Sequence, residues 1–390
     1  MKKTFVAVAV LGAFAGSAMA ADVTLYGKID LGLQYQHLDN GTTTTDQFKE
    51  TSGQNSGSRF GLKGTEDLGN GMKVGFVLEN GFSADDGKMG QGSRLFGREA
   101  QMYLTSDYGT LGFGRMGGLS SGLGSYNMNS FMAMSTGWGD QASKLSNFGL
   151  NRDRYDNSIV YRTPSFAGFQ VAAQYSFKMN GQEEVHTRAN QRYAALGATY
   201  KNGPFAAGLI VDSIFNTNTA TETNTEDTLG VTLGAAYDFE VVKVFALGQY
   251  GKNENKFGGL SNRGFAHTNA DGDALDPAKY TTDEGVTGYM FQLGMTAPVL
   301  GGTAYATVNY SDAESDLDKA VTGTVNGVEK SIGSKDFTGY GVALGYTYNL
   351  SKRTYVYTYA GYNELKTETE GAADKKDKNT EFGFGLVHSF

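Results

Sequence analysis

The chain ends in the stretch EFGFGLVHSF, residues 381–390, whose side chains alternate strictly between two types. Such a period of two predicts a β-strand, and the pattern continues to the terminal carboxylate. A bare hydrophobic strand at the edge of a soluble sheet invites aggregation, whereas a closed barrel in a membrane leaves no edge unpaired. We therefore interpret these residues as the closing strand of a transmembrane barrel, with an ordinary exposed edge strand as the alternative. The hydrophobic face consists of Phe382, Phe384, Leu386, His388 and Phe390.

The other end of the chain has the features of an export signal. Two lysines precede an apolar run over residues 5–14, and small residues then lead to Ala18-Met19-Ala20. A basic start, a short apolar core and an A-x-A site are typical of a cleaved secretory signal peptide. We expect residues 1–20 to be removed and residues 21–390 to form a single barrel domain.

The composition agrees with an exported β-protein. After the signal no apolar run approaches the about 18 residues that a transmembrane helix needs. The chain has no cysteine, which excludes disulfide frameworks, thiol catalysis and zinc–thiolate sites. It has 55 glycines but only 4 prolines, together with 23 tyrosines and 24 phenylalanines, a composition typical of strands with glycine where backbones bend or crowd.

The first stretch after the signal, 23–36, alternates without interruption, and Lys28 and Asp30 lie in the middle of its polar face. Because charged side chains need water, this face indicates a polar interior, as in a water-filled barrel. Similar segments recur along the chain, although four of them (95–106, 190–201, 241–251 and 354–365) do not reveal which face is which. The sequence predicts about sixteen strands: 23–36, 57–66, 72–82, 95–106, 109–116, 154–164, 168–178, 190–201, 204–214, 227–238, 241–251, 286–298, 302–312, 337–349, 354–365 and 380–390.

The connections between these strands alternate strictly between short and long. Seven short turns and eight longer polar stretches follow one another, which favours an all-β, antiparallel, up-and-down barrel over a sandwich with Greek-key crossings. One rim then carries the tight turns and the other the elaborated loops. The predicted long connections are 37–56, 83–94, 117–153, 179–189, 215–226, 252–285, 313–336 and 366–379.

Five stretches resemble the trimeric general porins of Gram-negative outer membranes, in particular the neisserial and betaproteobacterial branch. They are spread over the whole mature length, and together they are specific for this family. They read VTLYGKIDLGL at 23–33, SRFGLKGTEDLGNGMKVGF at 58–76, RYDNSIVYRTP at 154–164, LSKRT at 350–354 and LVHSF at 386–390.

This resemblance implies a sixteen-stranded barrel with loop 3, about 117–153, folded into the lumen as a constriction. It further implies a homotrimer in contact with outer-membrane lipid and lipopolysaccharide, and a terminal strand that is read by the barrel insertion machinery. The implied function is passive passage of ions and small hydrophilic solutes, with no cofactor and no catalysis. An acidic, exported chain also argues against nucleic acid as a partner.

In such a pore the chemistry is an electric field, since rings of one charge sign select ions. We predict a mild anion preference even though the formal net charge of the chain is −8. The alternative is that these basic residues are solvated rim charges. The predicted pore-lining residues are Lys28, Asp30, Arg59, Lys63, Arg98, Asp140, Arg154 and Arg162; Arg98 and Arg115 lie near strand ends, where the facing is open.

Other motifs carry less weight. Residues 112–117 match G-x-G-x-x-G, but no helical stripe follows, so a dinucleotide site is rejected. Residues 269–273 begin like a calcium loop without its later ligands, which leaves an ordinary turn or weak cation binding. The four histidines have no metal-ligand spacing. Trp138, in loop 3, either packs the loop against the wall or contacts solute.

Two other functions compete with a diffusion channel. An outer-membrane protease or lipase would need a nucleophile near a histidine at one rim, and no such pair is adjacent in the sequence. An adhesin would act through the long loops. Conductance separates the channel from both alternatives.

Overall fold

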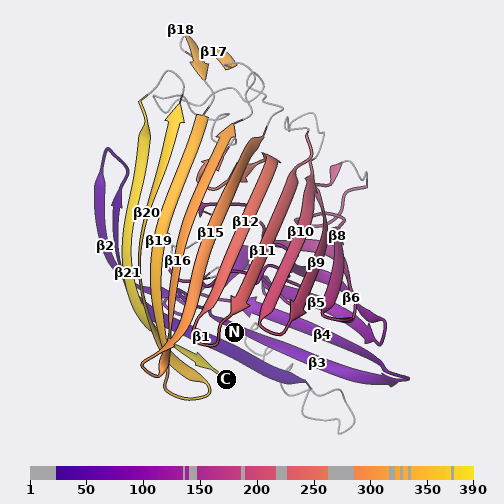
Figure 1. Cartoon of the computed structure of the whole chain (residues 1–390). Coiled ribbons are helices and arrows are strands. Elements are labelled where there is room, and N and C mark those ends of the chain that lie inside the picture. Colours follow the sequence, from indigo (N-terminus) through magenta and orange to yellow (C-terminus); the bar gives the residue numbers. More distant parts are fainter. Residues whose placement is uncertain are drawn as a thin grey trace, which may run out of the picture.

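Sixteen antiparallel strands of the computed structural model pair with their neighbours and close into a barrel (Figure 1). The structure describes residues 23–134, 137–139, 147–185, 189–216, 226–261, 285–315, 321–325, 328–332, 335–369 and 373–390. The predicted signal peptide, Asp140 and the 269–273 turn lie outside these residues. In the described part of the chain, no helix is long and apolar enough to cross a membrane.

The strands follow the predicted segments within a few residues at most ends. The sixteen barrel strands are β1 (Thr24–Asp39), β3 (Arg59–Gly69), β4 (Met72–Gly81), β5 (Glu99–Ser106), β6 (Gly109–Gly117), β7 (Arg154–Arg162), β8 (Phe169–Ser176), β9 (Arg192–Asn202), β10 (Phe205–Phe215), β11 (Leu229–Asp238), β12 (Lys243–Glu254), β15 (Val286–Val299), β16 (Gly302–Ser315), β19 (Lys335–Asn349), β20 (Thr354–Thr369) and β21 (Lys375–Ser389).

The last strand closes the barrel on the first, as its sequence predicts. β21 pairs with β1 from Lys28↔Ser389 to Asp39↔Lys378. Beyond the last ladder pair, the backbone N–H of Phe390 donates to the carbonyl of Gly27, and the N–H of Gly27 to the carbonyl of Phe390, both at 3.1 Å. Both described ends of the chain therefore lie at the rim of the short turns (Figure 1). The prediction of a closing strand is confirmed.

One strand that pairs with the barrel sheet was not predicted. β2 (Thr44–Ser52) lies within the expected connection 37–56 and pairs with the upper half of β1, from Leu31↔Ser52 to Asp39↔Thr44. Its residues are mostly polar and exposed, so it has no apolar face that a sequence pattern could reveal. The ladder to β1 forms it instead. Short pieces outside the barrel are α2 (Gly90–Ser93), β13 (Lys256–Phe257), β14 (Leu260–Ser261), β17 (Val321–Val325) and β18 (Val328–Ile332).

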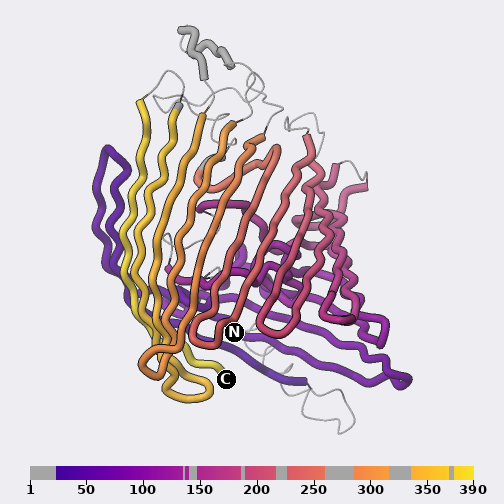
Figure 2. The backbone as a smooth tube through the Cα atoms, in the orientation of Figure 1, coloured from indigo at the N-terminus to yellow at the C-terminus, as the bar shows by residue number. Residues whose placement is uncertain are grey.

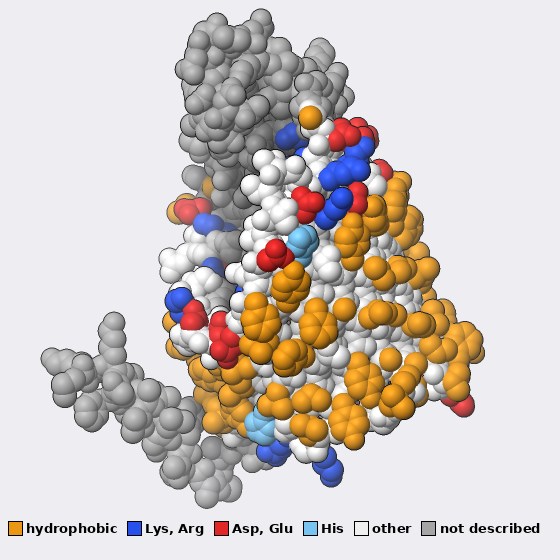
Figure 3. Space-filling model, turned by 90° about the vertical axis from the view of Figure 1, so that its left-hand side faces the viewer, with side chains coloured by type: hydrophobic (Ala, Val, Ile, Leu, Met, Phe, Trp, Pro, Cys, Tyr) orange, Lys and Arg blue, Asp and Glu red, His pale blue; other side chains and the backbone are white. Residues whose placement is uncertain are grey.

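The outer wall is apolar, as a surface in lipid requires. On the face that Figure 3 shows, hydrophobic side chains gather in a broad belt, and charged side chains gather above it. The terminal strand contributes Phe382, Phe384, Leu386 and Phe390 to this exposed surface, whereas Val387 between them points inward and is fully buried. Aromatic residues near strand ends are exposed as interfacial girdles would be: Tyr35, Tyr108, Phe166, Phe169, Phe205 and Phe239.

The barrel wall differs in height around its circumference (Figure 2). β5 and β8 each have 8 residues, whereas β1 and β20 each have 16. At about 3.3 Å per residue and a tilt of about 40°, 8 residues span about 20 Å and 16 span about 40 Å along the barrel axis. The wall is therefore low from β5 to β8 and high from β15 to β21.

Candidate pore constriction

We call the connection from β6 to β7, residues 118–153, loop 3. Its described residues, 118–134, 137–139 and 147–153, fold into the lumen and follow the inner wall. Their side chains enter pits at inward-facing glycines of the strands. A Cβ atom at Gly234 would lie 2.4 Å from the Phe131 ring, and one at Gly345 would lie 2.5 Å from the Trp138 ring. Because only glycine leaves this space, the inner wall is shaped for the loop.

Loop 3 also completes the apolar interior. Each of three buried hydrophobic clusters joins loop residues to inward-facing residues of the wall. Trp138, for example, packs against Tyr305 with tilted rings, 4.7 Å between ring centroids, and edge-on against Tyr357. Trp138 is buried, so its position agrees with packing of the loop against the wall rather than with contact to solute.

Beside the loop lies a cavity of about 570 Å³ lined mainly by polar and basic residues. Arg59 donates to the Gly57 carbonyl at 3.0 Å and to the Ser56 hydroxyl at 2.8 Å. Arg98 pairs with Glu79, its Nε 2.6 Å from a carboxylate oxygen. The segment between β2 and β3 thus holds the guanidinium of Arg59 next to the open space, and β4 holds that of Arg98.

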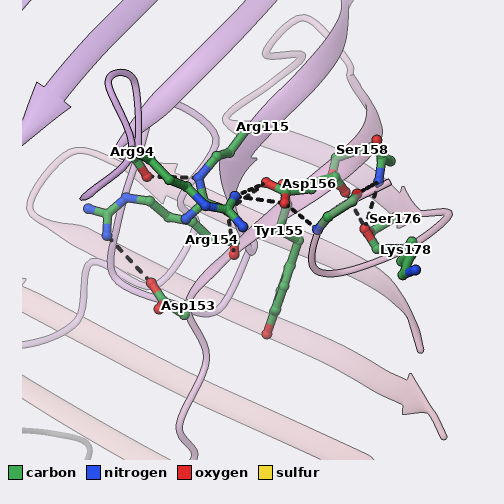
Figure 4. Close-up of polar contacts among 12 residues, drawn as sticks. Arg94, Arg115, Asp153, Arg154, Tyr155, Asp156, Ser158, Ser176 and Lys178 are labelled. Atoms are coloured by element: carbon green, nitrogen blue, oxygen red, sulfur yellow. Dashed lines mark hydrogen bonds and ion pairs between the residues drawn. The ribbon is translucent and has the colours of Figure 1, made fainter. Parts of the chain in front are cut away.

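Arg154 is a further basic residue of this cavity, which Arg152 also lines. Its Nη1 lies 3.4 Å from a carboxylate oxygen of Asp153, and its buried Nε has no hydrogen-bond partner among the described residues. Figure 4 shows its side chain directed toward Asp153 and away from Asp156. Asp153 is 69% exposed and is the one carboxylate among the described residues that line the cavity.

The other predicted residues occupy different places. Lys28 is half-buried and lies opposite Arg59 in the β1–β3 ladder. Lys63 is exposed, with its amino group over the Tyr26 ring at 5.2 Å, and Arg162 lies over the Tyr126 ring of loop 3 at 5.1 Å. These residues do not line the cavity described above.

Asp30 points inward but is completely covered. Its carboxylate accepts the backbone N–H groups of Asn55 and Ser56 at 2.8 and 2.7 Å, and the Tyr357 hydroxyl at 2.7 Å. Its place in the structure is therefore that of a support for the segment between β2 and β3. The segment between β2 and β3 separates the carboxylate of Asp30 from the open lumen.

Arg115, whose facing was open, does not line the cavity. Its Nη1 donates to Asp156 at 2.7 Å, and Asp156 also accepts two hydrogen bonds from Arg94 at 2.7 and 2.8 Å (Figure 4). This cluster of two arginines and one carboxylate fixes the connection between β4 and β5 against β7.

The closed barrel with its lumenal loop agrees with a comparison to known families. A family model described as Gram-negative porin matches residues 7–368. The chain belongs to the Gram-negative porin family. An outer membrane porin of Bordetella pertussis is 34% identical over the full length of both chains. Outer membrane porin protein 32 of Delftia acidovorans is 32% identical, again over the full length of both.

Further similarities support the same family. The major outer membrane protein P.IB of Neisseria gonorrhoeae is 33% identical over 53% of this porin and 56% of the relative. An anion-selective porin from Comamonas acidovorans has the same fold, with a TM-score of 0.66 and 24% identity over 95% of this porin and 100% of the solved chain. This porin is accordingly a protein of the outer membrane of Gram-negative bacteria, and its family consists of channels rather than enzymes.

Several charged residues of this porin's interior were missed by the sequence analysis. Glu79 holds Arg98, and Glu99 accepts the backbone N–H and the hydroxyl of Ser125 in loop 3. Inward parity on β4 and β5 is the signal that could have found them, because a carboxylate on an inward face needs water or a partner. A second missed group joins loop 3 to β10 and β12, at Asp212 and Glu254.

Proposed function

We propose that this porin passes ions and small hydrophilic solutes passively through its lumen, with a mild preference for anions at the constriction. The observation that carries the proposal is the cavity beside loop 3. Arg59, Arg98 and Arg154 line it together with one exposed carboxylate, Asp153. A narrow passage with low-dielectric walls concentrates the field of such charges and raises the local concentration of counter-ions.

The pairing of these charges limits the preference. Glu79 neutralises much of the charge of Arg98, while Lys28, opposite Arg59, and Lys63, four residues further along β3, add positive charge to the lumen. A field with partly compensated arginines favours anions without excluding cations. The description of the Comamonas relative as anion-selective supports the same sign.

We further propose that the porin is a homotrimer whose contacts use the low side of the wall. The strands from β5 to β8 span about 20 Å, less than the about 25 Å of the apolar band of such barrels. Lipid would therefore fit this side poorly, and neighbouring copies would cover it.

We also propose that the chain is cleaved after residue 20 and that the insertion machinery recognises its terminal strand. N-terminal sequencing of the mature protein tests the cleavage.

Single-channel recording in a planar bilayer with a KCl gradient tests the function. We expect stepwise conductance in groups of three and a reversal potential of the sign that anion preference requires. Clear cation selectivity would contradict the proposed field. No conductance from protein with heat-modifiable gel mobility would contradict the channel itself and favour the enzyme or adhesin interpretation.

A further inference from the structure

One carboxylate of the wall contacts both arms of loop 3. Asp212 of β10 accepts a hydrogen bond from the Ser120 hydroxyl at 2.5 Å, and Ser120 lies on the arm that leaves β6. The other oxygen of Asp212 accepts from the Nε of Arg152 at 2.7 Å, and Arg152 lies on the arm that returns to β7. The two arms are therefore held at one point of the wall, although 32 positions separate these two residues in the chain.

Arg152 is held on its other side as well. Its Nη1 and Nη2 donate to the two carboxylate oxygens of Glu254, at the end of β12, at 2.8 and 2.7 Å. The three side chains are at most 2% exposed. Burial alone would lower the pKa of Arg152, but Asp212 and Glu254 outweigh this effect and raise the pKa well above its usual value. The guanidinium thus stays charged, and removal of both carboxylates would leave a buried positive charge uncompensated.

The place of this contact ties it to the constriction. Arg152 is followed directly by Asp153 and Arg154, which both line the cavity. The backbone N–H of Gly118 on the outgoing arm donates to the carbonyl of Asp153 at 2.9 Å, so the two arms also touch each other at this level. A shift of the returning arm would carry the cavity's exposed carboxylate and its least-paired arginine with it.

We propose that Asp212 is a positioning residue that clasps the two arms of loop 3 and thereby fixes the width and the charge arrangement of the constriction. It contacts no solute itself. The inference rests on the proposed pore. It predicts that loss of Asp212 disturbs the constriction more than loss of Glu254. Glu254 holds one arm, whereas Asp212 holds both.

The wall provides room for this clasp at a glycine. A Cβ atom at Gly230 of β11 would lie 2.5 Å from the Asp212 carboxylate and 2.6 Å from Nη2 of Arg152. Gly230→Ala would therefore disturb the clasp while every charged group of the chain stays in place. This variant separates loss of the contact from loss of a charge.

The test compares single-channel recordings of Asp212→Asn, Glu254→Gln and Ser120→Ala with the parent trimer. An amide can accept from only one arm at a time, so we expect Asp212→Asn to raise the frequency of sub-conductance transitions at least about tenfold. Glu254→Gln only weakens the hold on the returning arm, and Ser120→Ala releases only the outgoing arm, so both are expected to have smaller effects. Asp238→Asn, at an exposed turn of the opposite rim, is the control and is expected to match the parent.

The recordings distinguish failure of the proposed pore from failure of the proposed clasp. A parent without conductance contradicts the proposed pore, whereas a conducting parent and a quiet, unchanged Asp212→Asn channel overturn the clasp alone. Equal effects of Asp212→Asn and Glu254→Gln also overturn it, because any buried charge would then suffice. If Asp212→Asn does not fold, as judged by heat-modifiable mobility, Gly230→Ala decides: frequent transitions support the clasp, and parent-like recordings overturn it.

Discussion

Replacement of Arg154 by glutamine removes one positive charge from the cavity without shortening the side chain much. A sphere with the cavity's volume has a radius of about 5 Å, and at that distance two unit charges interact by about 0.8 kcal/mol in water. Screening at 0.1 M salt leaves about 0.5 kcal/mol. Because the charge attracts anions and repels cations, its removal changes the difference between them by about 1 kcal/mol, or about fivefold in the permeability ratio.

The assay is the reversal potential of single channels of Arg154→Gln in a tenfold KCl gradient. Arg154→Lys keeps the charge and is expected to retain most of the anion preference. Arg353→Gln changes an exposed charge at the short-turn rim, where screening leaves little effect on the constriction. The reasoning fails if Arg154→Gln leaves the ratio unchanged, or if Arg154→Lys shifts it as much as the glutamine does.

Three further predictions concern the same interior. Asp153→Asn removes the exposed carboxylate of the cavity and is expected to raise the anion preference up to about fivefold, measured by the same reversal potential. Gly234→Ala places a methyl group against Phe131 and is expected to cost about 1–3 kcal/mol of unfolding free energy, measured by urea titration in detergent micelles. Asp30→Asn weakens three hydrogen bonds to a buried carboxylate, one of them from Ser56, and is expected to cost about 2 kcal/mol in the same titration.

These expectations have distinct points of failure. A lower anion preference in Asp153→Asn would show that this carboxylate does not face the ion path. For Gly234→Ala, the matched test is the double variant with Phe131→Leu, in which the smaller side chain should recover part of the loss. Full stability of Asp30→Asn would show that the segment between β2 and β3 is held by its other contacts.

The outer surface was predictable from the sequence because lipid imposes one simple demand on it. Alternating apolar residues identified the barrel strands, and the terminal stretch 381–390 identified the point of closure. β2 was missed because its residues face water on both sides of the hairpin, and only the ladder to β1 gives it structure. A strand without a buried face shows no alternation of apolar and polar residues in the sequence.

The inner surface was harder because it has two environments. Where the lumen is wet, inward positions are polar, but under loop 3 they are apolar, as with Phe245 and Leu247 of β12 and Tyr357 and Tyr359 of β20. Both strands lie in segments whose facing the sequence left open. The missing alternation was therefore itself a signal of the loop. The Asp212 clasp could not be predicted, because it depends on the registers of β10 and β12 relative to loop 3.

The burial of loop 3 against the wall has a consequence for protein engineering. In a barrel with a dry outside and a wet inside, the loop supplies the hydrophobic core that the hollow shape would otherwise lack. Deleting it to widen the channel would expose side chains such as Met290, Phe337 and Val387 to water. A wider channel built on this chain therefore requires a resurfaced inner wall, with polar residues in these positions and side chains in the vacated glycine pits.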